Sequence, residues 1–115
     1  MSSFFQVKLN QYLAFFNSQN LDSVLGMLDD SLQVEYQNIN NGKEVAKAAY
    51  IADFEKKKRV SMGKLVAETE DDQTVKIRVE LHLMPDKLNI DVTYTFAKSN
   101  QKMTHHLIHS VTPIA

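Results

Sequence analysis

Apolar and polar residues alternate through the last third of the chain, between Thr74 and Val111. The first of three such runs has these apolar positions, each separated from the next by one polar residue: Val75, Ile77, Val79, Leu81 and Leu83. A second run covers residues 88–96, and a less regular one covers residues 103–111. Because a β-strand sends successive side chains to opposite faces, each run predicts a strand with one buried face and one wet face. Three such strands in succession predict an antiparallel meander whose apolar face needs a cover.

The alternation also assigns individual side chains to the two faces of this sheet. We expect these apolar residues to be buried against helices: Val79, Leu81, Ile90, Val92, Tyr94 and Phe96. The charged residues between them should lie on the outer face, and they are Lys76, Arg78, Glu80 and Asp91.

The first half of the chain carries the spacing of amphipathic helices. Apolar residues three and four positions apart predict a first helix over residues 3–17, with Ser2 or Ser3 as its N-cap. A short second helix should follow an N-cap at residue 20 and end by residues 29–31, and a third should run from residue 42 to about residue 58. These helices are the natural cover for the apolar face of the sheet.

Two further strands complete the expected order of elements. Residues 32–36 alternate and predict a short strand, followed by a turn over residues 38–42. Residues 60–69 predict a longer strand with a weaker pattern, in which Gly63 marks a bulge. The fold class is therefore α+β, with a curved, antiparallel or mixed sheet closed by three helices.

Length and composition restrict the classes of function. A chain of 115 residues predicts a single domain over residues 1–115. Without cysteine the chain has no disulfide or thiolate chemistry, and a net charge of −1 disfavours general nucleic-acid binding. The first ten residues do not have the pattern of a signal peptide, and no apolar run reaches the roughly 20 residues that span a membrane. We therefore expect a cytoplasmic protein that binds neither nucleic acid nor membrane.

Three segments carry a resemblance to a known family. They are YLAFFNSQNLDSVLGMLDDSLQVEY, NGKEVAKAAYIADF and TYTFAKSNQKMTHHLIH. In this order and at this length, the chain resembles the nuclear transport factor 2-like superfamily, which includes cystatin-like folds, and most of all its SnoaL-like and ketosteroid-isomerase-like branches. The resemblance implies a cone in which a curved sheet wraps three helices, with a mostly apolar pocket at its open mouth. It also implies dimerisation through the outer sheet face, and it implies no cofactor.

The resemblance also implies roles for individual residues. Tyr12 matches a tyrosine that donates a hydrogen bond to the oxyanion of an enolised substrate, although it equally fits the apolar stripe of its helix as a core residue. Tyr36 occupies the position of the family's general base, and its neighbour Glu35 is one residue away, on the other face of the strand. The chain therefore lacks the carboxylate base of the isomerases at this position. The nearest match to the family's second oxyanion donor is Asp91, which alternation places on the polar face.

Histidines on the last strand are further candidates. If residues 99–100 form a two-residue loop, Phe96 pairs with Met103. His105 and His109 then share the inward face, and His106 lies on the opposite, outer face. Histidines in an apolar cavity can act as acid or base near neutral pH, or they can be structural residues hydrogen-bonded to neighbours. They are too far apart along a strand to hold one metal ion by themselves, and we predict no metal site.

These candidates define an expected pocket at the open end of the cone. Its predicted lining is Tyr12, Leu13, Phe16, Tyr36, Tyr50, Phe54, Tyr94, His105 and His109. Two functions fit it. The first is a module that binds a small apolar ligand, or that dimerises through the outer sheet face. The second is a cofactor-independent isomerase, lyase or polyketide-cyclase-like enzyme that acts on a small hydrophobic carbonyl compound, using His105, His109, Tyr12 and Tyr36.

Overall fold

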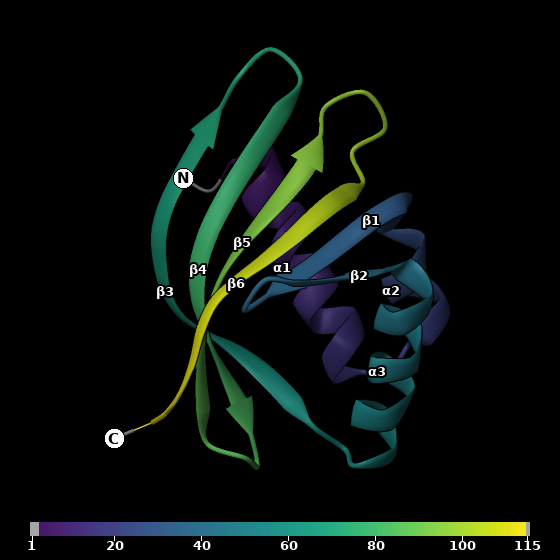
Figure 1. Cartoon of the computed structure of the whole chain (residues 1–115), viewed down its shortest axis with the longest axis vertical. Coiled ribbons are helices and arrows are strands. Elements are labelled where there is room, and N and C mark those ends of the chain that lie inside the picture. Colours follow the sequence, from purple (N-terminus) through teal and green to yellow (C-terminus); the bar gives the residue numbers. More distant parts are fainter. Residues whose placement is uncertain (1–2, 115) are drawn as a thin grey trace.

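The computed structural model describes residues 3–114, which form three helices and one six-stranded sheet. The elements in chain order are α1 (Phe4–Asn17), α2 (Leu21–Gly26), β1 (Leu28–Tyr36), β2 (Ile39–Gly42), α3 (Lys43–Glu55), β3 (Arg59–Glu70), β4 (Thr74–Met84), β5 (Leu88–Ala97) and β6 (Met103–Pro113). The strand order is β2-β1-β6-β5-β4-β3, and the β1–β6 pair is parallel whereas the other neighbours are antiparallel. Figure 1 shows the helices gathered on one side of the curved sheet. The expected α+β class with a mixed sheet is therefore confirmed.

The predicted faces of the two central strands are also confirmed. Five of the six expected inward residues are at most 6% exposed, and Ile90 is half-buried against the same core. On the opposite face Arg78 donates two hydrogen bonds to Asp91, at 2.9 and 2.7 Å, and Asn89 donates one to Glu80 at 2.9 Å. Three of the four outer charges that alternation predicted, Arg78, Glu80 and Asp91, thus have hydrogen-bond partners within the sheet.

The helix starts follow their capping residues. The Ser3 hydroxyl accepts a hydrogen bond from the amide of Gln6, and the Asn20 side chain accepts one from the amide of Ser23. The other capping candidate, Ser2, lies outside the described residues. Helix α1 then buries one stripe made of Leu9, Tyr12, Leu13 and Phe16. None of the helices within residues 3–114 is long and apolar enough to cross a membrane.

Three expected boundaries were wrong. Strand β1 begins at Leu28 rather than at residue 32, because Leu28 already pairs with Met103 of β6. Residues 39–42 form strand β2 rather than a turn, and the turn is Gln37-Asn38, whose φ angles of 51° and 66° suit a tight hairpin. Helix α3 ends at Glu55 rather than near residue 58, since Lys57 adopts a left-handed φ of 54°.

The bulge expected at Gly63 is confirmed by a register shift between Met62 and Lys64, where β3 pairs with β4. A side chain at Gly63 would come within 2.8 Å of the His82 ring and 3.1 Å of the Glu80 carbonyl oxygen. Glycine therefore lets the bulged strand lie close to β4.

Candidate ligand-binding pocket

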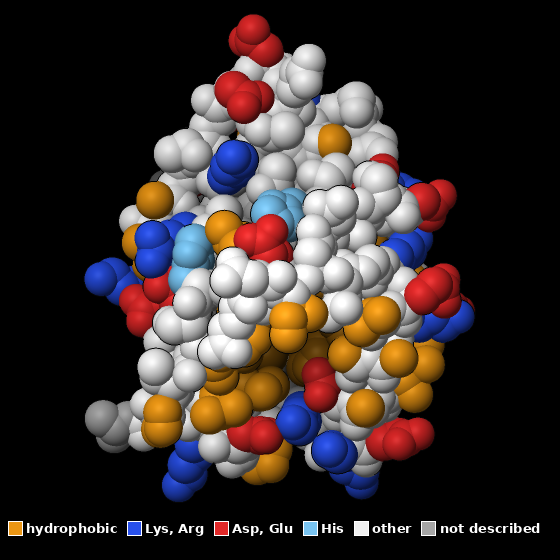
Figure 2. All heavy atoms as spheres, viewed as in Figure 1, with side chains coloured by type: hydrophobic (Ala, Val, Ile, Leu, Met, Phe, Trp, Pro, Cys, Tyr) orange, Lys and Arg blue, Asp and Glu red, His pale blue; other side chains and the backbone are white. Residues whose placement is uncertain are grey.

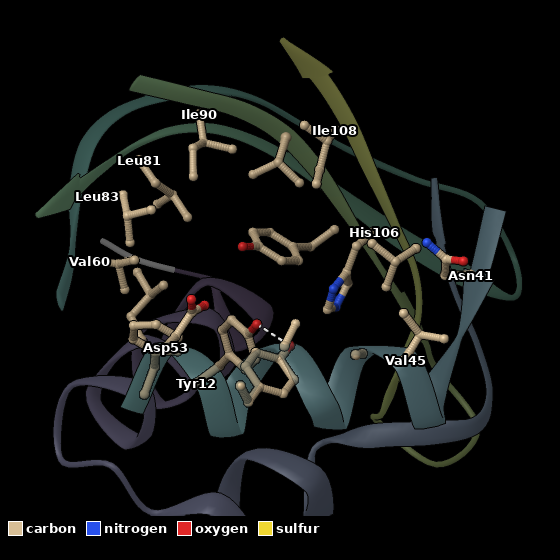
Figure 3. A pocket seen from close by; sticks show the side chains of 18 residues that line it. Tyr12, Asn41, Val45, Asp53, Val60, Leu81, Leu83, Ile90, His106 and Ile108 are labelled. Carbon is tan, nitrogen blue, oxygen red and sulfur yellow. Dashed lines mark hydrogen bonds between the residues drawn. The ribbon is translucent and has the colours of Figure 1, made fainter. Parts of the chain in front are cut away.

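A cavity of about 280 Å³ lies between the sheet and helices α1 and α3. Figure 2 shows a hollow on this face, edged by hydrophobic side chains, and Figure 3 shows the sheet residues on one side of it and the helix residues on the other. The residues that line it are Tyr12, Leu13, Phe16, Val34, Asn41, Val45, Ala46, Ala49, Tyr50, Asp53, Val60, Leu81, Leu83, Ile90, Val92, Tyr94, His106 and Ile108. Its size is near the lower end of the roughly 300–1,000 Å³ typical of ligand pockets.

The apolar part of the lining follows from the alternation of the strands. Leu81, Leu83, Ile90, Val92 and Ile108 come from β4, β5 and β6 and face the helices. Leu81 and Val92 are buried in the core, whereas Leu83, Ile90 and Ile108 are only partly buried. This stretch of the inner face is one wall of the cavity.

Three tyrosines supply the buried polar atoms of the pocket. The hydroxyls of Tyr12 and Tyr50 are hydrogen-bonded to each other at 2.5 Å, and the ring of Tyr94 meets that of Tyr12 edge-on at 5.6 Å. Burial raises the pKa of Tyr50 to about 12 and holds the pKa of Tyr12 well above its usual value. Burial also raises the pKa of Tyr94, so all three phenols are neutral hydrogen-bond donors in the physiological pH range.

His106, which sequence analysis placed on the outer face, is the histidine that lies in the pocket. Phe96 pairs with Met103 as expected, but Thr95 then pairs with His105, so Thr104 is an extra residue in a β-bulge. The bulge reverses the alternation that follows it, and His106 pairs with Tyr94 and is 5% exposed. Its ring meets that of Tyr94 at 4.7 Å, and burial lowers its pKa to about 3. The pocket histidine is therefore uncharged near neutral pH.

The expectation that His105 and His109 point into the cavity was wrong for the same reason. His105 lies on the outer face with its Nε2 3.7 Å from the Glu35 carboxylate. His109 is exposed, and its Nε2 is 2.7 Å from the Thr93 hydroxyl. Neither residue lines the pocket.

The other predicted lining residues divide into two groups. Tyr12, Leu13, Phe16, Tyr50 and Tyr94 do line the cavity. Tyr36 does not, and its hydroxyl instead accepts a hydrogen bond from Gln37. Phe54 packs behind the wall against Phe16, with ring centroids 5.3 Å apart.

Asp53 of α3 is a pocket residue that sequence analysis missed. Figure 3 shows its carboxylate at the cavity, across from His106. Burial raises its pKa above the usual value. The signal was present, because Asp53 follows Ala49 by four positions and Tyr50 by three and so belongs to the apolar stripe of its helix.

The two remaining carboxylates from the isomerase comparison do not reach the pocket. Glu35 is on the outer side of β1 near His105, and Asp91 is held by Arg78, whose hydrogen bonds keep the pKa of that carboxyl below its usual value. Within residues 3–114 there is also no cluster of three or more His, Asp or Glu side chains that could hold a metal ion. Among the described residues, Asp53, Asn41, the tyrosines and His106 are the polar side chains that line the cavity.

Solved structures place this architecture among known folds. The chain is similar to the epoxide hydrolase/cyclase-like enzyme SalBIII of salinomycin pyran-ring formation, with a TM-score of 0.67 and 13% identity over 90% of this chain and 88% of that one. A cystatin-like protein of unknown function from Nostoc punctiforme gives a TM-score of 0.71 and 13% identity, covering 91% and 86% of the two chains. A nuclear transport factor 2-like protein of unknown function from Cytophaga hutchinsonii gives 0.59 and 12%, covering 95% and 91%.

Sequence comparisons add no closer relationship. No protein-family model matches the chain. No curated protein matches it either. Identities of 12–13% establish fold and not activity, and the similar structures include both a cyclase-like enzyme and proteins of unknown function. On this structural evidence, the chain shares the fold of nuclear transport factor 2-like and cystatin-like proteins, which is the fold that its sequence resemblance implied.

Proposed function

We propose that the protein binds a small, mostly apolar ligand in the cavity between the sheet and helices α1 and α3. The observation that carries this proposal is the 280 Å³ cavity itself, with aliphatic walls and the Tyr12–Tyr50 hydroxyl pair at its helical side. A small number of polar groups at fixed positions in an otherwise apolar cavity is typical of sites that bind and orient a small molecule.

The tyrosine pair supports a ligand that carries a hydrogen-bond acceptor. In the pair one hydroxyl donates to the other, so the accepting hydroxyl keeps its own hydrogen for a further partner. A buried donor left without a partner costs about 1 to 3 kcal/mol. A carbonyl or hydroxyl oxygen of a ligand would remove that cost.

The proposal predicts a loss of affinity when the pair is broken. We expect wild-type protein to bind the neutral probe 2-(naphthalen-2-yl)ethanol with 1:1 stoichiometry in isothermal titration calorimetry, and Tyr50→Phe to weaken binding about three- to tenfold, as for the loss of one hydrogen bond. Tyr36→Phe is the matched control, because its hydroxyl lies outside the pocket, and it should bind as wild type does. Equal affinity in all three proteins would remove the tyrosine pair from the site.

A second candidate function is a cofactor-independent isomerase, lyase or polyketide-cyclase-like enzyme for a small hydrophobic carbonyl compound. The observation that favours it is Asp53, a carboxylate with a raised pKa that faces the same cavity as the Tyr12–Tyr50 pair. A carboxylate can take the proton while tyrosine hydroxyls stabilise the oxyanion. Turnover of steroid enones or aromatic polyketides that disappears in Asp53→Asn would support this enzyme over a binding module.

Homodimerisation through the outer sheet face is a separate proposal. It is supported by the arrangement of the fold, because the helices cover one face of the sheet and leave β4, β5 and β6 uncovered on the other (Figure 1). The paired charges of that face, such as Arg78–Asp91, suit a moderately polar two-fold interface. Light scattering at micromolar concentration should give about twice the chain mass of 13.1 kDa, and a mass near that of one chain would contradict the proposal.

A further inference from the structure

The charges around the cavity are unequally distributed. Its lining contains no lysine or arginine among the described residues, and the histidine in it, His106, is uncharged near neutral pH. Asp53 is the one acidic side chain in that lining. The lining therefore carries one acidic side chain and no lysine or arginine, a charge distribution that favours a cationic ligand over an anionic one.

Asp53 is also incompletely paired. The nearest cation is Lys58, whose Nζ lies 3.8 Å from Asp53 but 3.1 Å from Asp86. The shorter contact is a hydrogen bond, and it lowers the pKa of Asp86, whereas burial raises the pKa of Asp53 in spite of Lys58. Lys58 thus pairs mainly with Asp86, and the Asp53 carboxylate can still accept hydrogen bonds from a ligand in the cavity.

Aromatic rings complete the environment that a cation would meet. Phe16 and Tyr50 line the same pocket from the helical side, as Asp53 does, with ring centroids 6.2 Å apart. The faces of such rings attract an alkylammonium group, most strongly where water is excluded. A carboxylate beside aromatic faces is the combination that binds a protonated amine.

We propose that the pocket is selective for apolar ligands that carry a protonated amine, which Asp53 binds, and that it discriminates against carboxylates. This inference rests on the proposed ligand-binding function and specifies its chemical class.

The test uses three probes that share one skeleton and differ in the polar group. They are 2-(naphthalen-2-yl)ethylamine, the corresponding alcohol, and naphthalen-2-ylacetate, each titrated into wild-type protein at pH 7. We expect the amine to bind at least tenfold more tightly than the carboxylate, and the alcohol to lie between them. In Asp53→Asn the amine should lose at least tenfold in affinity and the carboxylate should gain. Glu55→Gln removes the same charge from the exposed end of α3, outside the lining. This variant should bind the three probes with the same order of affinities as wild-type protein.

Each outcome distinguishes this inference from the proposed function. If none of the probes binds wild-type protein, both fail. The inference fails, and the proposed ligand-binding function stands, in either of two cases. In the first, the alcohol binds but the amine binds no more tightly than the carboxylate. In the second, Asp53→Asn keeps the preference for the amine. A second readout needs no variant, because the ¹³C resonance of the Asp53 carboxyl should shift when the amine is added to wild-type protein and much less when the alcohol is added. An unshifted resonance at saturating amine would also overturn the inference.

Discussion

Lowering the pH from 7 to 4 should reduce the free energy of unfolding by roughly 3 kcal/mol through His106 alone. The residue is 5% exposed, and its neighbours are the rings of Tyr94 and Tyr12 and the sulfur of Met103, at 3.2 Å from Nε2. None of these groups stabilises an imidazolium as a carboxylate would. Burial, and to a lesser extent the nearby His105, therefore lower the pKa of His106 to about 3.

The sign follows from the difference between the folded and unfolded states. An unfolded histidine gains its proton near pH 6.5, whereas His106 in the folded protein stays neutral until about pH 3. The unfolded state thus binds more protons between these values, so the stability that is complete above pH 6.5 is lost as the pH falls. Aspartates with lowered pKa values, such as the half-buried Asp91, add to the same trend.

Urea unfolding at pH 7 and pH 4 isolates the contribution of His106. His106→Gln should show a much smaller drop in stability between the two pH values than wild type does. His109→Gln serves as the control, because His109 is exposed on the outer face, and it should keep the wild-type drop. Identical pH dependence in His106→Gln and wild type would show that His106 is not buried in its neutral form.

The prediction of the fold from sequence succeeded where one physical constraint acts along a whole element. In β4 every second residue must face the helices, so alternation from Val75 to Leu81 places each side chain without ambiguity. The capping residues Ser3 and Asn20 are equally local signals. The fold class followed from these features together with the order of the elements.

The prediction of the site failed where a tertiary contact decides the geometry. Strand β6 has Leu107 and Ile108 side by side, so its pattern is compatible with either face. The bulge at Thr104 turns His106 and Ile108 to the inward face. No glycine stands at the bulge to mark it in the sequence. A single extra residue thus exchanged His105 for His106 in the pocket. Asp53 was missed for another reason, because the predicted lining was drawn from large apolar, aromatic and histidine side chains and did not include a carboxylate.

Filling the mouth of the cavity should abolish most ligand binding. Ala49 is exposed on α3 and lines the pocket, so the indole of Ala49→Trp can occupy space that a ligand needs without displacing core side chains. We expect a loss of at least tenfold in affinity, about 1.4 kcal/mol. The substitution should leave the free energy of unfolding nearly unchanged, because the position is on the surface and the helix propensities differ by only about 0.5 kcal/mol.

The adjacent residue provides a matched comparison for the central claim that this cavity is a ligand site. Ala48 is also exposed on α3 but does not line the pocket, so Ala48→Trp has the same chemistry and helix propensity at a position that faces away from the cavity. The decisive measurement is the dissociation constant of 2-(naphthalen-2-yl)ethanol for the two variants at pH 7. The account predicts that Ala49→Trp binds at least tenfold more weakly than Ala48→Trp, whereas equal affinities in the two folded variants would show that the ligand binds elsewhere.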